Sequence, residues 1–154
     1  MNRRLRWVGL FSVASLLLLR ATDAERTAGS VWAEIYKSAW AGIYTNDQAA
    51  RGESAYRQRC ASCHGASLEG SDSAPPLSGR DFRDDFDEMN MADLFEKIQY
   101  TMPANRPAAL SQQQSADIVS YILKLNGFPA GSRGLPASVD DLRGVRFLAE
   151  NPSR

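Results

Sequence analysis

The chain has 154 residues, of which 44% are hydrophobic, and its 18 basic and 18 acidic residues balance at neutral pH. This length suits one domain, and the apolar share excludes a largely disordered chain. A binder of phosphates needs a basic stripe, and the chain has none, so nucleic acid is excluded as a partner.

The first 24 residues have the layout of a secretory signal. Residues 1–7 contain three arginines, and residues 8–19, VGLFSVASLLLL, are apolar throughout. This run is shorter than the ~20 residues that span a bilayer comfortably, and the small residues at 21–24 offer a cleavage site. We therefore expect export to the periplasm, with an uncleaved membrane anchor as the alternative. Without residues 1–24 the chain has 14 basic and 17 acidic residues, a net charge of −3.

Residues 25–45 are predicted to form an N-terminal arm. The segment WAEIY at 32–36 returns as WAGIY at 40–44, and the large side chains fall at helical spacing, so one apolar helical stripe is possible over 31–44. One five-residue echo does not make a repeat protein. We expect the arm to pack its aromatic side chains on the domain.

A first domain helix is predicted from Asn46 to Cys60. Thr45 with Gln48 resembles a capping box, and Asp47 is well placed for the first turn. Gly52 lowers helix stability by roughly 1 kcal/mol unless close packing requires it. Because Gly52 shares a side of this helix with Ala49, Tyr56 and Cys60, we expect another helix to cross there.

Glycines and prolines make residues 65–90 loop-like, with four apolar side chains available to pack inward: Leu68, Leu77, Phe82 and Phe86. Asn90 with Asp93 opens a second helix over 91–100, and Pro103 ends it. Acids crowd this part of the chain, at Asp81, Asp84, Asp85, Asp87, Glu88, Asp93 and Glu96. This acidic run is either a solvated face or a docking patch for a basic partner.

Ser111 with Gln114 forms a further capping box and begins the clearest helix, which Asn126 and Gly127 close. The remainder, 128–154, is expected to be a tail packed on the domain, with a short helix after Ser138. No stretch shows the alternation of a strand. The sequence therefore predicts an all-α fold, with the domain itself over 46–127.

The chemistry lies in CASCHG at 60–65, which holds both cysteines and the only histidine. A structural zinc site needs four ligands, a thioredoxin-type dithiol needs a βαβ context, and a cysteine nucleophile needs a base from elsewhere. C-x-x-C-H is instead the attachment signature of a c-type haem, in which Cys60 and Cys63 form the covalent links and His64 binds the iron. One covalent haem c is the predicted cofactor.

Methionine as the second axial ligand stabilises ferrous iron and suits electron transfer. The candidates are Met89, Met91 and Met102. Met89 and Met91 lie at the start of the second helix, where packing is the default role. Met102 lies between two helices and before a proline, so we assign it to the iron. Arg106 nearby is expected to be a surface residue or a partner of a haem propionate.

Four segments together resemble a monohaem class I cytochrome c of the periplasmic bacterial type. They are A-x-x-G-x-x-x-Y-x-x-x-C-x-x-C-H-G at 49–65, A-P-P-L at 74–77, T-M-P at 101–103 and DIVSYILKLNGFPAG at 117–131. The resemblance implies about three core helices around one haem, with Tyr56 meeting the C-terminal helix. It also assigns the carbonyl of Pro75 to the other imidazole nitrogen and places Leu77 against the haem.

The expected function is one-electron transfer with no substrate transformed, by a monomer in transient complexes. The partners would be an exported dehydrogenase on one side and a terminal oxidase or another cytochrome on the other. Residues 39–45 and the N-G-F-P-A-G segment resemble those of acceptors for quinoprotein dehydrogenases. The alternative is a haem sensor or peroxidase with an open or labile sixth iron position.

Overall fold

A computed structural model describes residues 36–153, so the predicted signal and residues 25–35 of the arm lie outside the described residues. Between residues 36 and 153 the chain is helical, with isolated β-bridges and no strand, which confirms the all-α prediction. No helix within this range is long and apolar enough to cross a membrane. The elements are η1 (Ala39–Ala41), α2 (Asn46–Arg59), α3 (Ala61–His64), α4 (Arg80–Asp85), α5 (Met91–Thr101), α6 (Gln112–Leu125) and α7 (Val139–Leu142).

The scaffold is the crossing of α2 and α6, which make the most extensive helix contact of the described chain. A Cβ on Gly52 would collide with the carbonyl oxygen of Asp117, so the predicted crossing at this glycine is confirmed. Beside it the Tyr56 and Tyr121 rings pack with centroids 5.4 Å apart. Glycine removes the side chain that would otherwise separate the two backbones.

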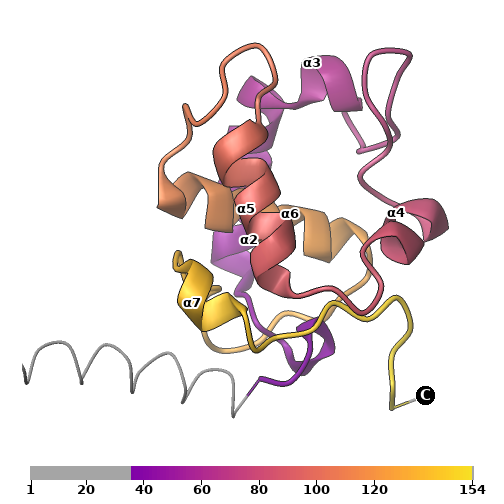
Figure 1. Cartoon of the computed structure of the whole chain (residues 1–154), viewed down its shortest axis with the longest axis vertical. Coiled ribbons are helices and arrows are strands. Elements are labelled where there is room, and N and C mark those ends of the chain that lie inside the picture. Colours follow the sequence, from indigo (N-terminus) through magenta and orange to yellow (C-terminus); the bar gives the residue numbers. More distant parts are fainter. Residues whose placement is uncertain (1–35, 154) are drawn as a thin grey trace, which may run out of the picture.

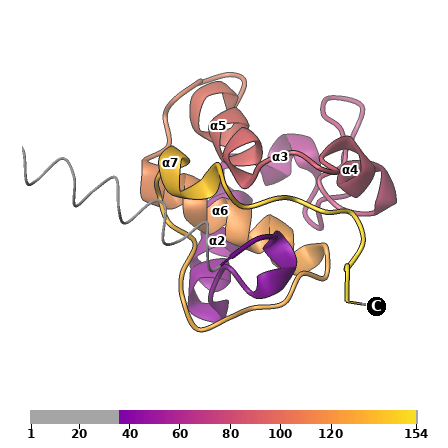
Figure 2. The same ribbon diagram turned by 60° about the horizontal axis from the view of Figure 1, so that its bottom comes forward.

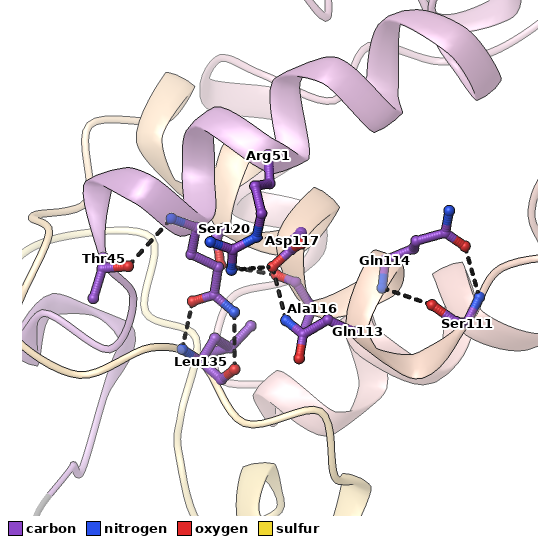
Figure 3. A network of polar contacts seen from close by, with 10 residues as sticks. Thr45, Arg51, Ser111, Gln113, Gln114, Ala116, Asp117, Ser120 and Leu135 are labelled. Atoms are coloured by element: carbon purple, nitrogen blue, oxygen red, sulfur yellow. Dashed lines mark hydrogen bonds and ion pairs between the residues drawn. The ribbon is translucent and has the colours of Figure 1, made fainter.

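Polar contacts flank this crossing (Figure 3). Arg51 on α2 donates two hydrogen bonds of 3.0 Å to the carboxylate of Asp117 on α6, and Gln113 donates a third of 2.8 Å. The Asp117 side chain is only 8% exposed, so these donors replace the water that burial removes. The pair fixes how α2 and α6 are rotated against each other.

The predicted caps of α5 and α6 are confirmed, whereas that of α2 is only half right. Thr45 Oγ1 accepts from the Gln48 backbone N–H at 3.2 Å, as expected. The Gln48 side chain does not return to Thr45 but reaches the tail, where it donates to the Leu135 carbonyl at 2.9 Å and accepts from its N–H at 2.6 Å. A buried tertiary partner has replaced the local one.

One local prediction is wrong. Residues 65–90 are not all loop, because α4 forms there, supported by burial of Phe82 in the helix and Phe86 at its C-cap. The helical stripe that the spacing allowed over 31–44 is not continuous from residue 36 onward. Gly42 adopts φ 73° and ends η1, and its backbone lies so close to Gly131 that neither could carry a Cβ without strain.

The arm and the tail are joined to each other across the bottom of the molecule (Figures 1 and 2). The Trp40 indole N–H donates to the Leu148 carbonyl at 2.8 Å, and the Tyr44 hydroxyl donates to the Phe128 carbonyl at 2.7 Å. Trp40 and Phe128 also stack, with centroids 4.3 Å apart. The predicted short helix after Ser138 is α7, which packs against α5.

Candidate functional site

A cavity of about 400 Å³ lies among α3, α4 and α5, the helices at the top, right and centre of Figure 1. Its inner walls are apolar and include Phe82, Phe86, Leu94, Ile98, Ile118 and Ile122. All six residues predicted for the site line this one cavity: Cys60, Cys63, His64, Pro75, Leu77 and Met102. Residues up to 42 positions apart in the sequence therefore meet at one place.

One side of the cavity is built from residues 60–65, where α2 ends and α3 begins. The Cys63 and His64 N–H groups both donate to the Cys60 carbonyl, at 3.1 and 3.0 Å, so the chain turns sharply here. The Tyr56 hydroxyl donates to the Gly65 carbonyl at 2.8 Å. This turn directs both cysteines and the histidine toward the same cavity.

His64 is buried, and its Nδ1 lies 2.8 Å from the carbonyl oxygen of Pro75. A carbonyl can only accept, so this contact places the imidazole proton on Nδ1 and leaves Nε2 with its lone pair. Nε2 is therefore the atom available to a metal. The contact also fixes the orientation of the ring.

Both cysteines are free thiols. Cys60 is buried, and burial, together with the neighbouring Cys63, raises the pKa of its thiol to about 11. Cys63 is exposed at the mouth. Since no disulfide joins them, each sulfur is available for a thioether bond.

Met102, the C-cap of α5, also lines the cavity. Its N–H donates to the Ile98 carbonyl at 3.3 Å, and the bond to Pro103 is cis. Met89 is 38% exposed and Met91 is fully buried, and neither lines the cavity. Met102 is thus the one of the three candidate methionines that reaches the site.

Sequence reasoning missed Gln99, which holds the loop after Met102. Gln99 is buried, and its Nε2 donates to the Leu110 carbonyl at 2.9 Å, closing residues 102–110 back onto α5. Its Oε1 has no hydrogen-bond partner within the described residues. The available signal was a polar residue four positions after Phe95 on the apolar face of the helix.

Charged groups stand at the border of the cavity and not inside it. Arg59, Asp85 and Lys97 line it and are exposed, whereas Arg106 is exposed and does not line it. The donor set therefore consists of two thiols, one imidazole lone pair and one thioether within apolar walls. This set fits haem c, whose covalent links need two cysteines and whose iron accepts nitrogen and thioether ligands.

Comparison with known proteins gives one match. Residues 47–122 match the family model described as cytochrome c oxidase, cbb3-type, subunit III. Neither the curated proteins nor the solved structures gave a match. The matched segment runs from α2 into α6 and contains all six predicted site residues, whereas the arm and the tail lie outside it.

Proposed function

We propose that this chain is a class I cytochrome c, an electron-transfer protein and not an enzyme, that carries single electrons in the periplasm with one covalent haem c. The family match over residues 47–122 supports this proposal. The observation that carries the proposal is the meeting of His64 and Met102 in one apolar cavity beside two free thiols. The predicted signal at residues 1–24 supports export.

Each residue has a definite task in this proposal. Cys60 and Cys63 hold the cofactor by thioether bonds, and His64 offers Nε2 to the iron while Pro75 keeps the ring in place. Met102 offers its thioether, which favours ferrous iron and raises the potential. Leu77 and the apolar walls of the cavity contact the haem and exclude water from it.

Haem c supplies iron that takes up and releases one electron. The chain itself leaves part of the cavity border exposed, at Cys63, Pro75, Pro76 and Ala104. These residues are uncharged, so a redox partner can contact them briefly without desolvating charged groups. A partner would approach here, bury less than ~1,200 Å² and leave again.

The proposed partners are an exported dehydrogenase, with a quinoprotein as the specific candidate, and an oxidase or second cytochrome. The acidic run supports a basic docking surface on one of them, since Asp81, Asp84 and Asp85 are exposed on α4 beside the cavity. We expect the electron-transfer rate with that partner to fall as salt rises, because screening weakens steering. A rate that stays constant to high ionic strength would make the acidic run a solvated face.

Intact mass and absorption spectra of the exported protein test the proposal together. The mass should equal the chain from the cleavage site plus one haem, and the ferric spectrum should show the near-infrared methionine-to-iron band. Ferrous protein should not bind carbon monoxide readily at neutral pH. A covalent haem without that band, combined with rapid carbon monoxide binding, would favour the sensor or peroxidase alternative.

A further inference from the structure

Two phenylalanines at α4 form one wall of the cavity. Phe82 lies in the helix and Phe86 at its C-cap, four positions apart and so on the same side, with ring centroids 5.0 Å apart. Both are buried. Yet α4 has only six residues and makes no extensive contact with another helix in the range 36–153. Something other than helix packing must hold this wall.

Phe147 lies directly behind the wall. Its ring meets Phe82 edge-on, with centroids 6.1 Å apart and planes at 87°, and lies 6.0 Å from the ring of Phe86. Phe147 is fully buried but does not line the cavity. It therefore supports the two rings that face the cofactor without touching the cofactor space itself.

The backbone around Phe147 is fixed from two sides. The Phe147 N–H donates to the Met89 carbonyl at 2.8 Å, and the Met91 N–H donates to the Val145 carbonyl at 2.8 Å. On the other side the arm makes two hydrogen bonds with Arg146. The Arg146 N–H donates to the Lys37 carbonyl at 3.0 Å, and the Ala39 N–H donates to the Arg146 carbonyl at 2.9 Å. Figure 2 shows the tail running from α7 across to the region of α4.

Phe147 also contacts an aromatic pair outside the wall. The Phe128 ring lies 5.0 Å away, and Trp40 stacks on Phe128 at 4.3 Å. Close-packed aromatic rings of this kind leave no room for Phe147 to retreat. Contact is thus continuous from the arm, through the tail, to the cavity wall.

We propose that Phe147 is a positioning residue that sets the reduction potential by holding the Phe82 and Phe86 wall closed to water. This rests on the proposed function, because it requires a haem in the cavity. Ferric haem carries one more positive charge than ferrous haem, so water near the ring stabilises the ferric form and lowers the potential. The tail, which lies outside the segment matched to the family, would then tune the site.

The test compares Phe147→Ala and Phe147→Leu with Leu142→Ala in the full-length holoprotein. Leu142 is a matched control, because it is also fully buried in the tail but belongs to α7, which packs on α5. The midpoint potential, the thermal unfolding temperature and the near-infrared methionine band are measured for each. Phe147→Ala and Leu142→Ala should both lower the unfolding temperature, since each leaves a cavity.

The midpoint potential should distinguish the Phe147 variants from Leu142→Ala. We expect a downward shift in Phe147→Ala, a smaller one in Phe147→Leu, and none in Leu142→Ala, with the methionine band retained in all three. An unchanged potential in Phe147→Ala, an equal shift in Leu142→Ala, or loss of the methionine band with the shift would overturn the inference. If Phe147→Ala does not fold, Phe147→Leu decides by the same criteria. Wild-type protein without covalent haem would instead refute the proposed function.

Discussion

The two sides of the cavity are built in different ways. The histidine side, residues 60–65 with Pro75, is made of neighbours in sequence, and its contacts span at most 11 positions. The methionine side, Met102 and the loop to Leu110, returns to the helix through the side chain of Gln99. Both sides use contacts that span 11 positions or fewer, so they differ in number: several hydrogen bonds hold the histidine side, whereas the loop after Met102 returns to α5 through one buried side chain. The histidine side should therefore tolerate perturbation elsewhere better than the methionine side.

The largest effect is expected from removing the histidine side's covalent links. Cys60→Ser with Cys63→Ser should abolish covalent haem, because no other cysteine exists in the chain. Denaturing electrophoresis with haem staining measures this directly. Met102→Ala, exported in the same way, is the control and should still stain for covalent haem. Covalent haem in the double variant would show that attachment does not use this motif.

Met102→Ala should keep the haem and lose the methionine-to-iron band, with rapid carbon monoxide binding to the ferrous form. The reason is that Met89 and Met91 do not line the cavity and cannot replace it without a rearrangement. Met89→Ala is the matched control, since its side chain is exposed and should leave the band unchanged. If the methionine-to-iron band survives Met102→Ala, the iron ligand is a residue other than Met102.

Short-range patterns account for most of what the sequence could predict. The three long helices and the caps of α5 and α6 depend on spacing and on short-range partners, and they are confirmed. The crossing at Gly52 has a distant partner, Asp117, but a glycine in the middle of a helix indicated it. The cluster at residues 60–65 could be found because its chemistry is contiguous. Helix α4 could not, because a short segment after Gly79 becomes a helix only when Phe82 and Phe86 find a distant partner.

The partners of buried polar side chains were the other part that could not be predicted. Gln48 satisfied the local capping pattern, yet its amide bonds to Leu135, 87 positions away. Gln99 lies among apolar residues of its helix, but its partner, the Leu110 carbonyl 11 positions away, became known only from the structure. The local sequence marks Gln99 only as a polar residue on an apolar helix face, and it identifies the partner of neither glutamine. Their roles come from which backbone groups folding buries next to them.

Gln99→Leu should loosen the methionine side alone. It leaves the Leu110 carbonyl buried without its donor, which costs about 1–3 kcal/mol. We expect the near-infrared methionine band to disappear on heating below the temperature of global unfolding. Wild-type protein should lose both together.

Gln48→Leu is the matched control for Gln99→Leu, because it breaks a second buried amide contact on the far end of α2 from the cavity motif. It should lower global stability by a similar or larger amount while the methionine band follows global unfolding. If both variants lose the band early, the methionine side is not held by Gln99 in particular.

The smallest effect is expected at Glu69, in the loop between residue 65 and Pro75. Hydrogen bonds from backbone N–H groups, its own first and then that of Ser67 at 2.7 Å, lower the pKa of this exposed carboxyl. A lowered folded-state pKa means that the contribution is complete above the unfolded pKa and is lost as pH falls through the folded one. The unfolding temperature of Glu69→Gln should therefore lie slightly below that of wild type at pH 7. The gap should close in the acid range below about pH 4.5. The methionine band should stay unchanged, because this loop contact involves neither Met102 nor Gln99.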